Sequence, residues 1–194
     1  MFSRRFEGFN ANQQQVIETA CQTMAAMSQR AIIAPRNMAL WFGAGQNAIV
    51  TPKLRMMEAV IADTARTVTF VNRAGGQLGV QHTDIYTKTL LAPGNFQDLT
   101  GVVAYAHPVD RRDEPGPKRT ISHVGSGMRI YLNDVFFQLD ATERAVTVYH
   151  ELTHKVLATN DHAYDPGPCQ ALAINNPGQA TDNADNFALF VAQC

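Results

Sequence analysis

The stretch Val148-Tyr149-His150-Glu151-Leu152-Thr153-His154-Lys155 decides how the rest of the chain is interpreted, because it contains the pattern H-E-x-x-H. On a helix, residues four positions apart lie on the same face, about one turn from each other. Two histidines at this spacing can bind one metal ion, and the glutamate between them can accept a proton from a water molecule beside that ion. The pattern predicts a zinc site with hydrolytic chemistry.

The residues around this pattern predict a helix from about Ala141 to Leu157. Asp140 and Glu143 have the spacing of a capping box, which marks a helix start. An apolar stripe indicates that the helix is central and largely buried; it comprises Ala145, Val148 or Tyr149, Leu152 and Val156. The alternative interpretation is that His150 and His154 are two core histidines bonded to backbone groups.

A third metal ligand is expected outside the pattern, because catalytic zinc takes three protein ligands and leaves one position for water. The segment just after the helix offers Asp161 and His162 as candidates. The same segment contains Tyr164, whose hydroxyl group can donate a hydrogen bond. The residues alone leave both candidates for the third ligand open.

The end of the chain resembles the aspzincins, the deuterolysin and peptidyl-Lys metalloendopeptidase family. In that family H-E-x-x-H is followed by a segment like G-T-x-D-x-x-Y-G, and Thr159, Asp161 and Tyr164 fall on its Thr, Asp and Tyr. The segment Asn183–Phe187 resembles the N-A-D-x-[FY] segment that follows in the same family. The resemblance implies a zincin-like fold, a zinc cofactor, Asp161 as the third ligand and Tyr164 as a catalytic hydroxyl donor.

The chain departs from the family pattern at positions that affect loop geometry and specificity. Ala158 and Asp165 replace the two glycines, and Ala188 stands where lysine-specific members have an acidic residue. Asp185 is expected either to brace a ligand histidine or to line the pocket for a substrate side chain, and we assign it to substrate binding. Ala188 would lie one turn later on the same face, so half of the counter-charge is missing. We expect a broad, at most mildly basic specificity, and a gain of lysine preference in Ala188→Glu.

Composition limits the domain count and the classes of partner. The 194 residues, 45% of them hydrophobic, suffice for one well-packed domain, and we expect a single domain over residues 1–194. A formal charge of −1 argues against nucleic acid and anionic membranes as partners. The N-terminus lacks the apolar core of a secretory signal. We expect secretion without a classical signal peptide, with a cytoplasmic location as the alternative.

The remaining segments predict helices followed by short strands, and therefore an α+β fold. Helices are expected at Asn10–Arg30, from Pro52 or Lys53 to about Arg66 and at Thr181–Ala192, and strands at Thr67–Asn72, Gly101–Ala106 and Gly125–Asn133. Gly125–Asn133 is interpreted either as an ordinary sheet strand or as the sheet edge beside the cleft, where an extended peptide can pair, and its position just before the helix favours the edge. Asp110–Arg119 is charged and contains prolines, so a solvated loop is expected there. A bridge between Cys169 and Cys194 and three free thiols, Cys21 included, remain alternatives.

Together these features predict a zincin-like α+β domain in which helices pack on a small twisted sheet and the cleft lies beside the H-E-x-x-H helix. The expected function is hydrolysis of internal peptide bonds, with zinc bound by His150, His154 and Asp161, and with Glu151 and Tyr164 as catalytic groups. The alternatives are a zinc amidase acting on cell-wall peptides and a non-catalytic zinc-binding interaction module. By analogy alone, we interpret the domain as a bacterial effector or toxin domain, whose partners would be a secretion machine and a cognate inhibitor protein.

Overall fold

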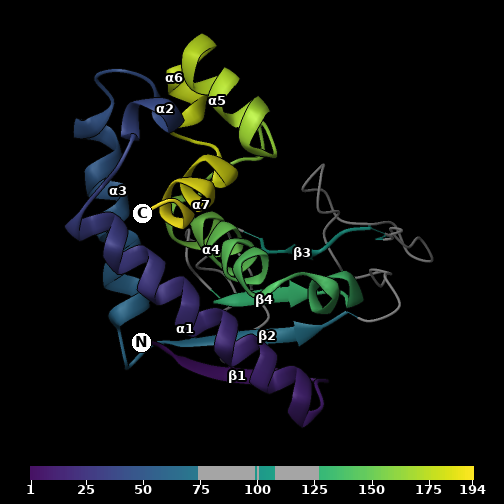
Figure 1. Cartoon of the computed structure of the whole chain (residues 1–194). Helices are drawn as coiled ribbons and strands as arrows, with labels where there is room; N and C mark the ends of the chain where they lie inside the picture. The colour runs from purple at the N-terminus through teal and green to yellow at the C-terminus, as the bar shows by residue number, and fades with distance from the viewer. Residues whose placement is uncertain (74–98, 100, 108–126) are drawn as a thin grey trace, which may run out of the picture.

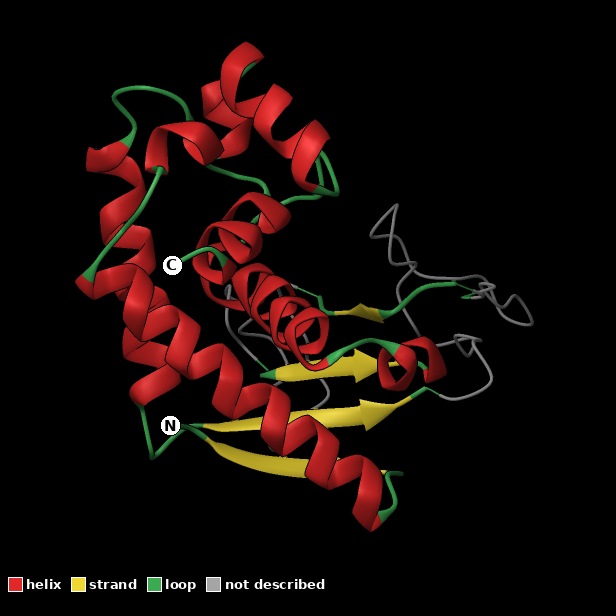
Figure 2. Ribbon diagram, viewed as in Figure 1, coloured by secondary structure: helices red, strands yellow, loops and turns green. Residues whose placement is uncertain are grey.

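The protein has the α+β architecture that the sequence predicts, with helices packed around a small mixed sheet (Figures 1 and 2). The structure is a computed structural model, and it describes residues 1–73, 99, 101–107 and 127–194. The helix that carries H-E-x-x-H, α4 (Ala141–Leu157), lies between the sheet and a group of three short helices (Figure 1). These are α2 (Met38–Phe42), α5 (Pro166–Asn175) and α6 (Pro177–Ala180).

The sheet has its described strands in the order β1-β2-β4-β3. Their bounds are Ser3–Glu7 for β1, Thr67–Asn72 for β2, Arg129–Leu132 for β4 and Ala104–Tyr105 for β3. β2 pairs in parallel with β1 and with β4, whereas β3 pairs with β4 in antiparallel. The inner strands β2 and β4 are buried along most of their length, which is typical of strands covered on both faces.

Of the two interpretations of the strand before α4, the structure has the ordinary sheet strand, and the favoured one, the sheet edge, is wrong. The strand expected at Gly125–Asn133 is β4, and it is an inner strand and not the edge. The edge strand near α4 is β3, from the predicted run Gly101–Ala106. Ser3–Glu7 was not predicted as a strand, because its charged side chains hide the apolar alternation that marks one. The place of a strand in a sheet depends on partners distant in sequence, which local pattern does not specify.

Two long helices pack with α4 to build the core. α1 (Ala11–Ile33) begins at Asn10, where a capping box joins Asn10 and Gln13. α3 (Asn47–Ala62) begins before the predicted start, and Pro52 lies inside it. The prediction used proline as a helix start, but here the helix accepts the loss of one N–H donor within its second turn.

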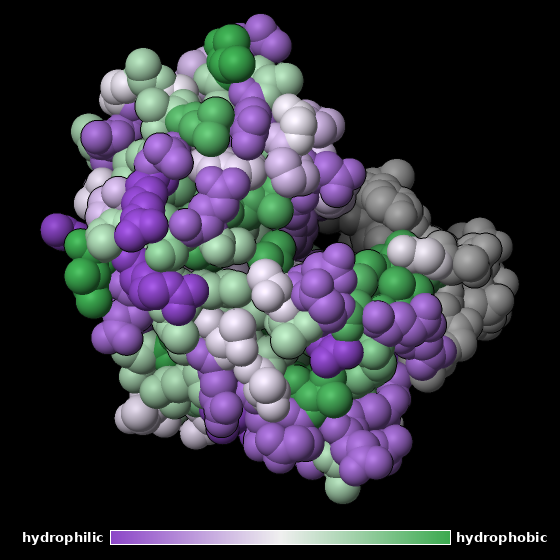
Figure 3. Space-filling model, viewed as in Figure 1, coloured by the Kyte–Doolittle hydropathy of each residue, from purple (hydrophilic) through white to green (hydrophobic). Residues whose placement is uncertain are grey.

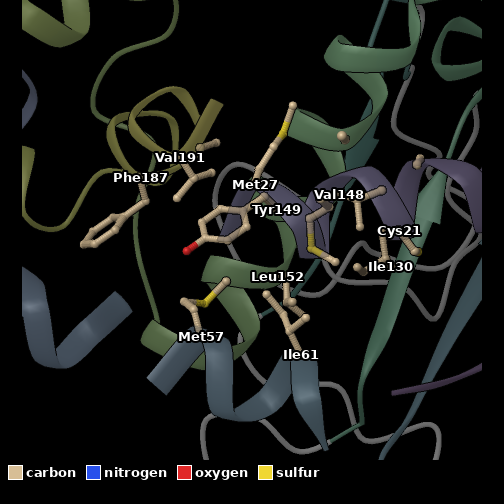
Figure 4. Close-up of a cluster of buried hydrophobic side chains, with 14 of the residues drawn as sticks. Cys21, Met27, Met57, Ile61, Ile130, Val148, Tyr149, Leu152, Phe187 and Val191 are labelled. Atoms are coloured by element: carbon tan, nitrogen blue, oxygen red, sulfur yellow. The ribbon is translucent and has the colours of Figure 1, made fainter. Parts of the chain in front are cut away.

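The buried side of α4 is held by residues from four other elements. Its residues Val148, Tyr149 and Leu152 are fully buried. They belong to one cluster (Figure 4) together with Cys21 and Met27 of α1, Met57 and Ile61 of α3, Ile130 of β4, and Phe187 and Val191 of the last helix. Close packing on this side fixes the rotation of α4, and therefore the direction in which its histidines project.

The C-terminal part contains more helices than the sequence predicted. A 3₁₀ helix, η1 (Asp134–Gln138), precedes α4, and α5 and α6 each have a proline in their first turn. The last helix, α7 (Ala184–Ala192), begins after the predicted cap at Thr181. All three cysteines are free, so the Cys169–Cys194 bridge is absent from the structure.

Hydrophobic residues form small groups among hydrophilic ones on the face shown in Figure 3. Among the helices of the described ranges, none combines the length and apolar character needed to span a membrane. The predicted solvated loop at Asp110–Arg119 lies outside the described residues.

Candidate metal centre

The local signals around H-E-x-x-H produce the predicted helix. The capping box between Asp140 and Glu143 is present, with both reciprocal hydrogen bonds formed. His150, Glu151 and His154 are 8%, 4% and 6% exposed, and all three line a pocket of about 470 Å³. The helix therefore delivers three polar side chains to one largely buried place.

Each histidine is oriented by a hydrogen bond at its Nδ1 atom. His150 Nδ1 lies 2.6 Å from Oδ1 of Asp185, and His154 Nδ1 lies 2.7 Å from the carbonyl oxygen of Thr159. A carbonyl or carboxylate oxygen accepts, so each Nδ1 carries a hydrogen, and each Nε2 is the atom that would bind a metal ion once it has no proton. Acceptors behind ligand histidines fix the tautomer and ring orientation in metal sites in this way.

Asp161 completes a triad with the two Nε2 atoms. The two Nε2 atoms are 3.1 Å apart, and Oδ1 of Asp161 is 3.1 Å from His150 and 3.3 Å from His154. A tetrahedral zinc ion with bonds of about 2.0–2.1 Å places its ligand atoms about 3.3 Å from each other. The donor set of two imidazoles and a carboxylate thus fits zinc in chemistry and in spacing.

His162, the other candidate ligand, lies away from the triad. Its Nε2 atom is 3.2 Å from Oδ2 of Asp182, and its backbone N–H donates to Asn183. The two residues are adjacent in the sequence, but their side chains have different partners: Asp161 contacts the two histidines and His162 contacts Asp182. The structure therefore brings Asp161, and not His162, to the two histidines.

The charges of the triad show that it favours a bound positive charge. Burial by itself lowers the pKa of His150, but hydrogen bonds to Asp161 and Asp185 outweigh burial and raise that pKa to about 10. Burial would raise the pKa of Asp161, but hydrogen bonds to His150 and His154 hold that pKa far below its usual range. A proton and a metal ion compete for such a cluster.

Tyr164 stands at the open side of the triad. Its ring stacks on His150, with centroids 6.0 Å apart, and the residue is 53% exposed. Burial of its hydroxyl group and the nearby carboxylates, Asp161 first, raise the pKa of Tyr164 above its usual value. The hydroxyl group consequently keeps its hydrogen at neutral pH and can donate it to an acceptor in the pocket.

The pocket is enclosed by elements far apart in the sequence. Residues 101–106, which include the edge strand β3, form one wall, and Val146 and Thr147 of α4 form another. The carboxylate residues Asp165 and Asp185 also line it. The pocket thus combines an apolar strand edge with a cluster of acidic groups around the triad.

Asp185 is engaged on both of its oxygens. Oδ1 contacts His150, and Oδ2 accepts a hydrogen bond of 3.0 Å from the backbone N–H of Asp165. Asp185 therefore braces a histidine, one of the two expectations, and it also lines the pocket. The expectation for Ala188 was wrong: it is fully buried in the hydrophobic core and is not among the described residues that line the pocket. Asp185 lines the pocket, whereas Ala188, three residues later on α7, is buried in the core.

Several residues that shape the centre had no role in the sequence analysis. Thr153 donates to the carbonyl oxygen of His150, and its hydroxyl group lies 2.7 Å from that of Thr159. Asn183 contacts the loop that carries Asp161. Thr159 and Asn183 lie in the two segments that resemble the family, which was the available signal, but their hydrogen-bond partners are set by the fold.

Comparisons with known proteins give matches in sequence and in fold. The family model described as lysine-specific metallo-endopeptidase matches residues 120–192, which contain α4, the loop with Asp161 and Tyr164, and α7. A peptidyl-Lys metalloendopeptidase from Armillaria mellea is 30% identical over 141 residues, which is 66% of this chain and 36% of that protein. The chain therefore spans little more than a third of the length of that relative.

The fold is similar to a solved structure. A zinc peptidase from Grifola frondosa matches with a TM-score of 0.65 at 18% identity, over 95% of this chain and 97% of that chain. At this identity the likeness concerns the fold, and it extends over the N-terminal part that the family model leaves out. The three comparisons agree with each other: residues 120–192 are similar to the lysine-specific metallo-endopeptidase family, 141 residues are similar to part of a peptidyl-Lys metalloendopeptidase, and the fold is similar to that of a zinc peptidase.

Proposed function

We propose that this chain is an endopeptidase that hydrolyses internal peptide bonds of proteins, with zinc held by His150, His154 and Asp161. The observation that supports this most directly is the spacing of the triad, whose ligand atoms lie 3.1–3.3 Å apart with Glu151 beside them in the same pocket. A structural zinc site needs neither a general base nor an open pocket. Both are present here, which favours catalysis over a purely structural or binding role.

The roles of the residues follow from their chemistry. Zinc, when bound, supplies a Lewis acid that polarises the scissile carbonyl group and acidifies water. Glu151 would take a proton from the attacking water as the oxygen–carbon bond forms, and pass it to the amine as the carbon–nitrogen bond breaks. Tyr164, which keeps its hydrogen at neutral pH, would donate a hydrogen bond to the carbonyl oxygen as negative charge develops there.

We propose that the active-site cleft lies between β3 and α4 and receives an extended peptide. β3 is the edge strand of the described sheet, and residues 101–106 line the same pocket as the triad. An edge strand can add an extended peptide through backbone hydrogen bonds. This mode binds many sequences, since the backbone is common to all of them.

We propose a broad specificity, at most mildly basic, although the names of the matched family model and relative refer to lysine. Asp185, the expected partner of a basic side chain, already contacts His150 and the N–H of Asp165. Asp165 adds a carboxylate to the pocket wall where the family pattern has glycine. Profiling of cleavage sites in a denatured proteome digest tests this: nearly exclusive cutting before lysine would contradict it.

The function is tested by one combined experiment. Protein purified without chelators is analysed for zinc and then incubated with a peptide library and with cell-wall fragments. We expect one zinc per chain, cleavage of the peptides, and no cleavage by Glu151→Gln. Cleavage of cell-wall fragments alone would support the amidase alternative, and bound zinc without any cleavage would support a non-catalytic module.

The biological setting stays a prediction. Action outside the producing cell, delivery by a secretion machine, and control by a cognate inhibitor are proposals that rest on analogy. The single-domain organisation of residues 1–194 also stays a prediction. A pull-down from the native organism with the Glu151→Gln protein would identify a partner or inhibitor without cleaving it.

A further inference from the structure

The loop between α4 and α5 carries Asp161 and Tyr164 but has almost no regular structure of its own. Within the part of the chain that the structure describes, it has one strand-like backbone pairing, an isolated bridge between Asn160 and Asn183. In this bridge Asn160 N–H donates to the carbonyl oxygen of Asp182 at 2.8 Å, and Ala184 N–H donates to that of Asn160 at 3.0 Å. This pairing fixes the start of the loop, just before Asp161, and leaves the next residues to be held by other contacts.

Three of those contacts come from one side chain, that of Asn183. Oδ1 of Asn183 accepts hydrogen bonds from the backbone N–H groups of His162, at 2.7 Å, and Ala163, at 3.1 Å. Its Nδ2 donates to the carbonyl oxygen of Ala163 at 2.9 Å. His162 and Ala163 are the two residues between Asp161 and Tyr164. The amide of Asn183 therefore makes three hydrogen bonds to the backbone that separates Asp161, the third ligand of the triad, from Tyr164, the hydroxyl donor.

The amide of Asn183 is itself held in place by Asn186 of α7. Nδ2 also donates to Oδ1 of Asn186 at 2.7 Å, and Asn186 in turn donates to the carbonyl oxygens of Cys169, at 3.0 Å, and Trp41. Both asparagines are 0% exposed. The orientation of Asn183 is determined, because rotating its amide by half a turn would bring two donors against the loop N–H groups. Aspartate lacks the donor, and serine lacks the reach.

We infer that Asn183 is a positioning residue that sets Asp161 and Tyr164 relative to the two histidines. The inference rests on the proposed function, and it assigns to Asn183 a role apart from any contact with substrate or metal. Residues that orient metal ligands typically change metal affinity or activity by about 10- to 100-fold when they are removed. Because one amide serves both Asp161 and Tyr164, its loss is expected to affect metal binding and turnover together.

The test uses Asn183→Ala, with Val191→Ala as a matched control. Val191 is a fully buried residue of α7, the helix that begins just after Asn183, and it packs in the core, so its truncation lowers stability at a place apart from the loop. We measure zinc affinity by chelator competition, the visible spectrum of the cobalt-substituted protein, amide hydrogen exchange at His162 and Ala163, and kcat and KM at saturating zinc. All measurements are made well below the melting temperature of each variant.

For Asn183→Ala we expect zinc affinity lower by about 10- to 100-fold, an altered cobalt spectrum, faster exchange of the two amides, and a lower kcat with KM nearly unchanged. Val191→Ala should match the wild type in all of these despite a lower melting temperature. Equal zinc affinity and an unchanged spectrum in Asn183→Ala would overturn the inference. If Asn183→Ala does not fold, Asn183→Ser is compared in the same way.

The metal measurements do not depend on turnover, so the two hypotheses fail separately. A wild-type protein that binds zinc but cuts no peptide would contradict the proposed function, and the zinc affinity and cobalt spectrum would still decide the role of Asn183. A wild-type protein that cuts peptides, with an Asn183→Ala variant of the same zinc affinity and kcat, would contradict only the inference about Asn183.

Discussion

Replacing Asp185 with asparagine tests how the fold orients His150. The carboxylate accepts from His150 Nδ1 at 2.6 Å and from Asp165 N–H at 3.0 Å, so both partners are donors. An amide offers one acceptor and one donor. Whichever way it is turned, one of the two hydrogen bonds becomes a contact between donors.

The expected loss follows from that geometry. A hydrogen bond to a charged group contributes about 1.5–3 kcal/mol, and this loss falls on the tautomer of His150 that presents Nε2 to the metal. We expect zinc affinity to fall by about 10- to 100-fold, which corresponds to about 1.4–2.7 kcal/mol. Loss of the negative charge acts in the same direction.

Competition with a chromophoric chelator measures the zinc dissociation constants of the wild type, Asp185→Asn and a control. The control is Asp182→Asn, which removes a carboxylate that contacts Asn160 and His162 but no member of the triad. We expect the control to stay within about threefold of the wild type, since its contacts are exposed. Equal affinities for Asp185→Asn and the wild type would refute the orienting role of Asp185.

Four further predictions follow. Glu151→Gln should keep zinc and fold but lower kcat by at least about a thousandfold, and retained activity would overturn its role as the general base. In zinc-free protein, the pKa of His150 is raised from about 6.5 in the unfolded chain to about 10 in the folded chain. The stability that this shift contributes is complete below pH 6.5 and is lost as the pH rises towards 10, so the melting temperature should fall over this range. A constant melting temperature would contradict this. Ala158 has φ 55°, so Ala158→Gly should raise the free energy of unfolding by about 1 kcal/mol in denaturant titrations, and a decrease would refute strain there. Ala188→Glu should unfold or strongly destabilise the protein, because it buries a carboxylate in the core. A stable variant with a new preference for lysine would instead show that residue 188 reaches the substrate pocket.

Ala158 and Asp165 have an unusual backbone conformation at the two positions where the family pattern has glycine. Both residues replace glycines of the pattern, and both have positive φ, 55° and 66°. The sequence comparison identified the departures, and the structure shows that both positions have a backbone conformation that glycine adopts more readily than alanine or aspartate. The strain at Asp165 is accompanied by the hydrogen bond from its N–H to Asp185.

Local chemistry was sufficient for the parts of this protein that depend on neighbours in the chain. The capping box at Asp140 and the apolar stripe predicted α4 at Ala141–Leu157, the bounds that the structure has, and β-branched residues predicted β2 at Thr67–Asn72. Helix caps, i to i+4 spacing and strand propensity act over a few residues. The spacing of His150, Glu151 and His154 on one helix face is also such a short-range feature.

Only the tertiary structure decided the features that depend on distant residues. It places Asp161 and not His162 beside the histidines, in a loop whose backbone at His162 and Ala163 donates hydrogen bonds to Asn183, about twenty residues later. It makes β3 the edge strand beside α4. It also buries Ala188 in the core, although Asp185, one turn earlier on α7, lines the pocket. These outcomes depend on which elements pack together and on which buried groups find hydrogen-bond partners, and both are set by contacts between segments far apart in the sequence.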